Sequence, residues 1–136
     1  MKVCTKGTVM SGYLKRILVV EDEDAARDIL CALLVQARYA VFAARNGQEA
    51  FAEVQREHFD VVVIDCDRPH LDGRGLLSLN RVASPPTPVI ILSGGPAESS
   101  EVVTQLGAYA WVEKPYDTYV LLEIIGNAAQ AAAQTT

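Results

Sequence analysis

The 136-residue sequence has few of the features that mark a thiol-rich or membrane-embedded protein. Its three cysteines, Cys4, Cys31 and Cys66, are far apart, and no two of them form a CxxC pair. A disulfide framework or a zinc site is therefore not expected, and this usage fits a reducing cytoplasm. No apolar run approaches the roughly 18 residues of a membrane-spanning helix, and no signal peptide precedes the first apolar run. We expect a cytoplasmic protein without a membrane partner.

Basic residues are scarce in the second half of the chain. After Arg81 the only lysine or arginine is Lys114, whereas five acidic residues follow Arg81, and the formal net charge of the whole chain is -5. A surface that binds nucleic acid needs lysines and arginines clustered on one face or along one helix. The sequence therefore predicts that this domain does not bind nucleic acid.

What the sequence does contain is a series of short apolar runs. Val61 to Ile64 are four consecutive branched residues, which is the pattern of a strand buried on both faces of a parallel sheet. Similar runs occupy 17–20, 40–43, 89–92 and 108–112. Helical patterns follow the five runs in turn, at 24–34, 47–54, 76–79, 97–106 and 117–125. This alternation predicts a doubly wound α/β domain: a five-stranded parallel sheet with helices on both faces.

The length of the chain suits a single domain. Residues 1–14 show no periodicity and are expected to form an N-terminal extension, 15–128 the domain, and 129–136 an Ala/Gln-rich tail that frays. Asp24 and Asp117 are predicted N-caps of the first and last helices, and Asn46-Gly47 makes the turn into the second helix. The first helix is expected to carry the apolar residues Ala25, Ile29, Leu30, Ala32, Leu33 and Leu34.

Polar side chains stand where the predicted strands end. Asp65 directly follows the central run, Ser93 and Lys114 follow the fourth and fifth runs, and the first run ends at Glu21 and Asp22. In an open parallel sheet the carboxyl ends of the strands lie at one edge, and ligands bind in the crevice outside that edge. These five side chains are therefore expected to converge.

Several carboxylates and one lysine in a common crevice predict phosphoryl-transfer chemistry. Two unit charges about 4 Å apart interact by about 4 kcal/mol at an effective dielectric near 20, so the acidic group needs a proton or a cation. Oxygen ligands with room for water suit Mg²⁺. Mg²⁺, Lys114 and the Ser93 hydroxyl could each contact one oxygen of a moving phosphoryl group, and Asp65 is a competent nucleophile that would become an acyl phosphate.

A set of short motifs, each weak by itself, occurs in order along residues 15–125. The motifs are Ile17-Leu18-Val19-Val20-Glu21-Asp22-Glu23, Asn46-Gly47-Gln48-Glu49-Ala50, Ile64-Asp65 with Pro69 and Asp72-Gly73, Ser93, Gly107-Ala108 and Lys114-Pro115. In this combination and spacing the chain resembles the receiver domain of response regulators, the phosphoacceptor module of two-component signalling. The resemblance implies a flavodoxin-like, CheY-like fold with strand order 2-1-3-4-5.

The resemblance also implies a role for each matching residue. Asp65 would be the phosphoacceptor, and Ser93 and Lys114 would act beside it in catalysis. The implied Mg²⁺ ligands are Asp22 and Asp65 directly, Glu21 through water, and the backbone carbonyl of Asp67. Ser93 and Trp111 take the positions of the family's switch hydroxyl and switch aromatic.

The function implied by the resemblance is phosphorylation-controlled signalling. The domain would accept phosphate from the phosphohistidine of a sensor histidine kinase or a histidine phosphotransfer protein, and would catalyse only its own phosphorylation and dephosphorylation. Its output would pass to a downstream protein effector or to a second copy. The surface for this output would be the face formed by the fourth helix, the fifth strand and the fifth helix, roughly residues 97–125.

Two alternatives stay open at this point. Asp65-Cys66-Asp67 resembles the Asp-x-Asp nucleophile and acid/base pair of haloacid-dehalogenase-like phosphatases, although that family places its nucleophile on the first strand and an acidic pair after the lysine. The other alternative is a pseudo-receiver, which works by binding without phosphorylation. Asp67 keeps it open, because the receiver family more often has an uncharged side chain at that position.

Overall fold

The computed structural model describes residues 2–3, 14–65, 87–94 and 108–134. The strands are β1 (Lys2–Val3), β2 (Arg16–Val20), β3 (Ala40–Ala44), β4 (Val61–Asp65), β5 (Val89–Ser93) and β6 (Ala110–Glu113), and the helices are α1 (Asp24–Gln36), α2 (Gly47–Arg56) and α5 (Thr118–Gln134). The expected helices at 76–79 and 97–106 lie outside the described residues. Within the described ranges, no helix combines the length and apolar character that crossing a bilayer requires.

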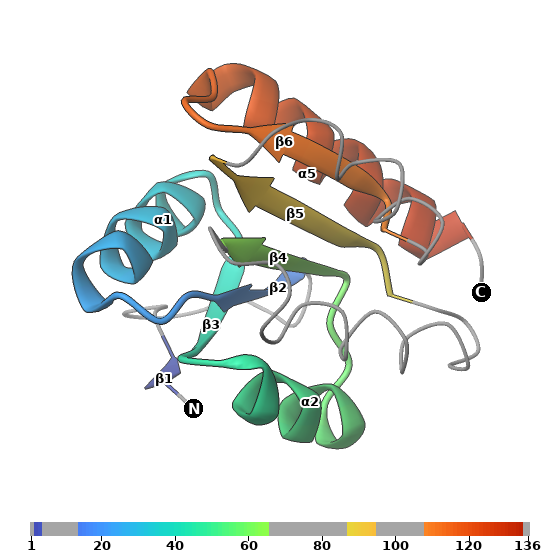
Figure 1. Ribbon diagram of the computed structural model, residues 1–136. Helices are drawn as coiled ribbons and strands as arrows, with labels where there is room; N and C mark the ends of the chain where they lie inside the picture. The colour runs from blue at the N-terminus through green and yellow to red at the C-terminus, as the bar shows by residue number, and fades with distance from the viewer. Residues whose placement is uncertain (1, 4–13, 66–86, 95–107, 135–136) are drawn as a thin grey trace.

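The sheet has the predicted order. Its six strands run β1-β3-β2-β4-β5-β6, and every neighbouring pair from β3 to β6 is parallel. Counted among the parallel strands alone, this is the order 2-1-3-4-5, so the predicted flavodoxin-like arrangement is confirmed. Helices α1 and α5 lie on one face of the sheet and α2 lies on the other (Figure 1).

The sheet separates two apolar clusters. Ile17 and Val19 of β2 belong to the cluster under α1 and α5, whereas Leu18 and Val20 belong to the cluster under α2. This division follows from the strand geometry, because successive side chains point to opposite faces. All five residues of β4 and all five of β5 are buried. Burial on both faces explains why these strands appear in the sequence as unbroken apolar runs.

Both ends of the described chain carry more secondary structure than the sequence predicted. β1 lies in the expected N-terminal extension and pairs antiparallel with β3. An edge strand presents unpaired N–H and C=O groups, which a short extended segment can satisfy, and two residues are too few to show a periodic pattern. At the other end, α5 continues to Gln134, and Ala129 is buried in the core. The helix therefore runs on into the segment that we expected to be a fraying tail.

One of the two predicted N-caps, Asp117, is confirmed, and Asn46, predicted to lie in the turn before the second helix, is itself an N-cap. The side chain of Asn46 accepts a hydrogen bond from the backbone N–H of Glu49 at 2.8 Å, which caps α2. Asp117 Oδ1 accepts from the backbone N–H of Tyr119 at 2.8 Å and caps α5 in the same way. Each side-chain oxygen satisfies an N–H group that the first turn of a helix leaves without a partner.

The buried stripe of α1 contains only some of the apolar residues expected on this helix. It consists of Arg27, Leu30, Cys31 and Leu34, which are spaced i, i+3, i+4 and i+7 along the helix. Ile29, one of the apolar residues expected on this helix, is 71% exposed. One residue corresponds to about 100° of rotation around a helix, so the residue before Leu30 leaves the stripe. An arginine, and not an isoleucine, completes the buried face.

The position of α1 can be tested with a pair of truncations. Leu34 is fully buried, and Leu34→Ala is expected to lower the free energy of unfolding by about 2–5 kcal/mol because it removes buried methyl groups and leaves a cavity. Ile29→Ala, on the exposed side of the same helix, should change it by less than about 0.5 kcal/mol. Urea unfolding followed by circular dichroism measures both values. Equal losses for the two variants would contradict this placement of α1.

Candidate functional site

The candidate site lies at the carboxyl edge of the sheet, where the central strands end (Figure 1). Asp65 is the last residue of β4 and is 8% exposed, and Ser93 is the last residue of β5 and is fully buried. Glu21 is the first residue after β2 and is also buried. Of the residues predicted from the sequence, the described structure therefore brings these three to the same edge, on three adjacent strands.

Lys114 extends from the end of β6 to Asp65. Its Nζ forms an ion pair with Asp65 Oδ1. The backbone N–H of Lys114 donates to the carbonyl of Ser93 at 2.9 Å, which continues the pairing of β5 and β6 one step beyond the strands. The Lys114 side chain is 27% exposed and that of Asp65 8% exposed, so water screens this pair less than it would screen a surface pair.

Glu21 shows how crowded with negative charge the site is. The pKa of its carboxyl is raised from 4.5 to about 7, first by burial and then by the neighbouring carboxylates of Asp65 and Asp22 and a hydrogen bond to Asp65. The backbone N–H of Glu23, which donates to Glu21 Oε1 at 3.1 Å, acts in the opposite direction. Near neutral pH this carboxyl carries a proton for part of the time.

The predicted metal ligands are only partly assembled in the described residues. Asp22 is exposed, and Asp67 lies outside the described ranges. Within those ranges, no three His, Cys, Asp or Glu side chains lie close enough together to form a metal-binding group. Mg²⁺ does not require such a group, because it commonly uses one or two carboxylates and keeps several waters. The oxygen donors of Glu21 and Asp65 and the unbalanced negative charge around them therefore fit Mg²⁺.

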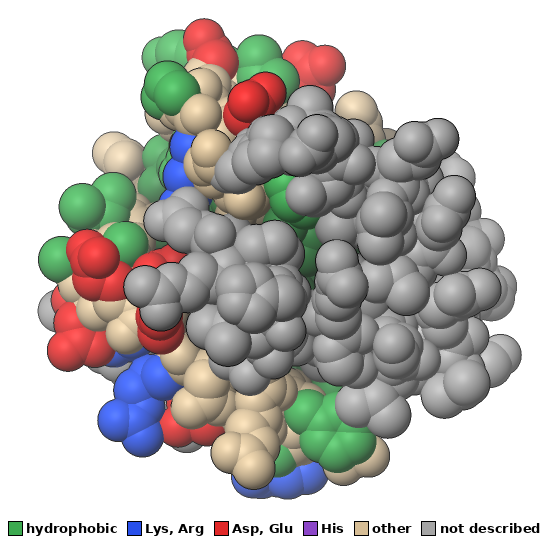
Figure 2. Space-filling model, viewed as in Figure 1, with side chains coloured by type: hydrophobic (Ala, Val, Ile, Leu, Met, Phe, Trp, Pro, Cys, Tyr) green, Lys and Arg blue, Asp and Glu red, His purple; other side chains and the backbone are tan. Residues whose placement is uncertain are grey.

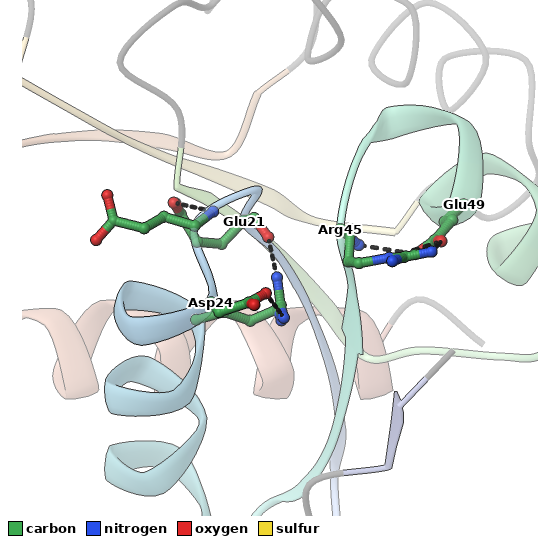
Figure 3. Close-up of polar contacts among 6 residues, drawn as sticks. Glu21, Asp24, Arg45 and Glu49 are labelled. Atoms are coloured by element: carbon green, nitrogen blue, oxygen red, sulfur yellow. Dashed lines mark hydrogen bonds and ion pairs between the residues drawn. The ribbon is translucent and has the colours of Figure 1, made fainter.

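A buried arginine that the sequence analysis missed holds the turn after β2. Arg27 Nη1 donates to the carbonyl of Glu21 at 3.0 Å, and Arg27 Nη2 pairs with Asp24 Oδ1 (Figure 3). The predicted N-cap at Asp24 is therefore wrong: Glu23 takes the N-cap position, and the Asp24 carboxylate binds Arg27 instead. The helical spacing of residues 27, 30, 31 and 34 was the signal that could have revealed Arg27 as buried.

Tyr116 is a second residue that the sequence analysis missed. It is half-buried, and burial raises the pKa of its phenol, followed by the charge of Asp65, while the charge of Lys114 opposes the shift. Its ring packs against the cluster under α1 and α5. The charges of Asp65 and Lys114 therefore both act on this phenol. Its position in the sequence, two residues after the lysine, did not predict this interaction.

Trp111, the predicted switch aromatic, lies on β6 opposite Ile91 of β5. It is partly buried and packs against the cluster under α2. Its indole Nε1 is buried and has no hydrogen-bond partner among the described residues. A buried N–H without an acceptor is costly, so the described conformation leaves this side chain incompletely satisfied.

Comparisons with known proteins agree with this fold. A family model described as the response regulator receiver domain matches residues 17–126. The transcriptional regulatory protein GlrR of Escherichia coli (strain K12) is 30% identical over 128 residues, which cover 93% of this chain and 29% of that protein. The chain thus spans less than a third of the length of this curated relative.

Solved structures give the same result. A CheY-like response regulator receiver domain protein from Methanospirillum hungatei JF-1 has a TM-score of 0.80 and 29% identity, covering 90% of this chain and 99% of that one. The response regulator protein TrrA from Thermotoga maritima, in complex with Mg²⁺-BeF, has a TM-score of 0.75 and 27% identity, covering 85% of this chain and 99% of that one.

These comparisons give no support to the phosphatase or pseudo-receiver alternatives. The family match extends over most of the chain and includes every described residue of the candidate site. The parallel strands have the order that the CheY-like neighbours share. On this evidence the chain belongs to the family of response regulator receiver domains, the signalling modules of two-component systems.

Proposed function

We propose that Asp65 accepts a phosphoryl group from a phosphohistidine, in a Mg²⁺-dependent reaction that switches a protein-interaction surface. The observation that carries this proposal is the ion pair between Asp65, buried at the end of β4, and Lys114 at the end of β6. An oxygen of the Asp65 carboxylate attacks phosphorus, and the bond from phosphorus to the donor imidazole nitrogen breaks. The electron pair of that bond stays on the imidazole, and Asp65 becomes an acyl phosphate.

The other residues of the site stabilise the charge of the moving phosphoryl group. The Lys114 ammonium, already paired with Asp65, contacts one phosphoryl oxygen, and the Ser93 hydroxyl donates to another. Glu21, Asp22 and Asp65 would hold Mg²⁺ together with the backbone carbonyl of Asp67. When bound, Mg²⁺ supplies positive charge to the phosphoryl oxygens. The Mg²⁺-BeF complex of the related TrrA supports this assignment.

The phosphorylated state would be communicated through Ser93 and Trp111. When phosphate is present at Asp65, the Ser93 hydroxyl moves toward it, and Trp111 moves with the end of β5. Both shifts bias a pre-existing equilibrium of the output face, roughly residues 97–125. The donor would be a sensor histidine kinase or a histidine phosphotransfer protein in the cytoplasm. The downstream component would be a protein effector, as the greater length of the regulator GlrR suggests, or a second copy of the domain.

The acceptor residue can be identified by mass. Incubation with acetyl phosphate and Mg²⁺ is expected to add one phosphoryl group per chain, measured by intact-protein mass spectrometry, and Asp65→Asn should abolish the addition. Asp60→Asn is the matched control, because Asp60 lies just before the other end of β4 and accepts a hydrogen bond from Arg16 N that asparagine can keep. Phosphorylation that survives in Asp65→Asn would overturn the proposal.

The crowding at Glu21 predicts a pH-dependent effect of Mg²⁺. The pKa of Glu21, about 7, lies above its ordinary 4.5, so in EDTA its contribution to stability is complete below about pH 4.5 and is lost as the pH rises through 7. Mg²⁺ competes with this proton, so the rise in Tm on adding Mg²⁺ should be larger near pH 8 than near pH 5. At about 100 times its Kd, Mg²⁺ would stabilise the chain by about 2.7 kcal/mol.

Glu21→Gln is the control for this measurement. It removes the titrating carboxyl at the same volume, so the stability of this variant in EDTA should depend less on pH than that of the unsubstituted chain. A Tm gain from Mg²⁺ that is the same at both pH values would contradict the assignment of Glu21 to the cation site.

The switch can be followed by fluorescence, because Trp111 is the only tryptophan in the chain. Phosphorylation of the unsubstituted chain is expected to change its emission. Ser93→Ala should still take up phosphate, more slowly, but should show a smaller change in emission per phosphate bound, because it lacks the hydroxyl that couples the phosphate to β5. Equal changes per phosphate in both proteins would show that Ser93 and Trp111 are not coupled.

A further inference from the structure

Arg27 is a buried cation on a helix face that otherwise packs against the core. It is 6% exposed and shares the inward stripe of α1 with Leu30 and Leu34. Burying a guanidinium is costly unless its charge and hydrogen-bond donors are satisfied, and arginine is almost never fully buried without partners. If packing were the only requirement at this position, an apolar side chain would meet it. The partners of Arg27 therefore indicate a second role.

Those partners tie the main chain of Glu21 to two elements of the fold. The Glu21 carbonyl accepts from Arg27 Nη1 at 3.0 Å, in a buried hydrogen bond (Figure 3). The Glu21 N–H donates to the carbonyl of Ala44 at 3.1 Å. One end of this residue is thus fixed to α1 and the other to the end of β3. The second guanidinium nitrogen, Nη2, pairs with Asp24 in the first turn of α1.

The same guanidinium is the only base in a strongly acidic stretch. Residues 21–28 contain five carboxylates and a single arginine. Acidic side chains gather over the region of α1 on the face shown in Figure 2. Carboxylates this close in sequence repel one another, and a buried cation among them offsets that repulsion. Without Arg27, both the repulsion and the unpaired Glu21 carbonyl would favour opening of the turn.

We propose that Arg27 is a positioning residue for the cation site. It fixes the Glu21 peptide so that the turn after β2 holds the Glu21 and Asp22 carboxylates at the rim of the crevice next to Asp65. Arg27 itself contacts neither the cation nor the phosphoryl group; it acts through the main chain of Glu21. This inference rests on the proposed function, because the proposed function is what makes the cation Mg²⁺.

The test compares three variants of the full chain. Arg27→Gln removes the positive charge and the paired contacts to the Glu21 carbonyl and to Asp24. Arg27→Lys keeps the charge but not the two contacts of the guanidinium. Arg56→Gln is the control, because Arg56 lies on α2 with a side chain that is 71% exposed. Isothermal titration with Mg²⁺ is expected to give a Kd about 10-fold weaker for Arg27→Gln, a partial recovery for Arg27→Lys and no change for Arg56→Gln. Phosphorylation by acetyl phosphate at saturating Mg²⁺ should approach the unsubstituted rate in all three.

A second measurement uses the metal-free protein. Amide hydrogen exchange at Glu21, which donates to Ala44, should be faster in Arg27→Gln than in the unsubstituted chain, whereas exchange in β4 should be unchanged. A folded Arg27→Gln with unchanged Mg²⁺ affinity overturns the inference, and so does unchanged exchange at Glu21. If the unsubstituted chain takes up no phosphate, the proposed function fails by itself, and the exchange measurement still decides whether Arg27 fixes the turn.

Discussion

The ion pair between Asp65 and Lys114 is the contact on which the site depends, and the topology of the sheet makes it possible. Asp65 is the last residue of β4 and Lys114 directly follows β6, and these two strands lie on either side of β5. The pair therefore spans the end of β5, above the buried Ser93. Parallel strands bring such ends together although the residues are far apart in sequence. A sheet with more strands between β4 and β6 would hold the same carboxylate and ammonium too far apart to pair.

Negative charge at this edge exceeds the positive charge that the described residues supply to it. Lys114 pairs with Asp65, and the Arg27 guanidinium is committed to the Glu21 carbonyl and to Asp24. Glu21 is left with a raised pKa, caused first by burial and then by its acidic neighbours. A protein can meet such an excess with a proton or with a bound cation. The same excess would favour a site that responds to Mg²⁺ and pH together.

Much of this arrangement could be predicted from the sequence, because a strand that is buried on both faces of the sheet appears as an unbroken apolar run. The unbroken run from Val61 to Ile64 predicted a central strand, and the strand order followed from the family motifs. The prediction failed for individual side chains on α1, where a shift of one position in the sequence changes the face of the helix on which a residue lies. Arg27 was overlooked, because apolar character alone does not reveal a charged side chain that is buried for its hydrogen bonds.

The remaining errors have a similar cause. Asp24 has the chemistry of an N-cap, but a nearby guanidinium competes for its carboxylate, and this competitor is visible only once the helix is built. The pairing of β1 with β3 involves two residues, so no periodic signal exists for it. Tyr116 comes under the influence of Asp65 only because the chain turns back beside the site after β6. Local patterns identify elements well, whereas contacts between elements depend on the assembled fold.

The two sides of the site differ in how completely their polar groups are satisfied. On the side of α1, the Glu21 peptide has a partner for both its N–H and its carbonyl. On the side of β6, the Trp111 indole N–H is buried without an acceptor among the described residues. The wall of the site at Glu21 is therefore fixed by two elements, α1 and β3, whereas the described residues give the Trp111 indole N–H no such anchor.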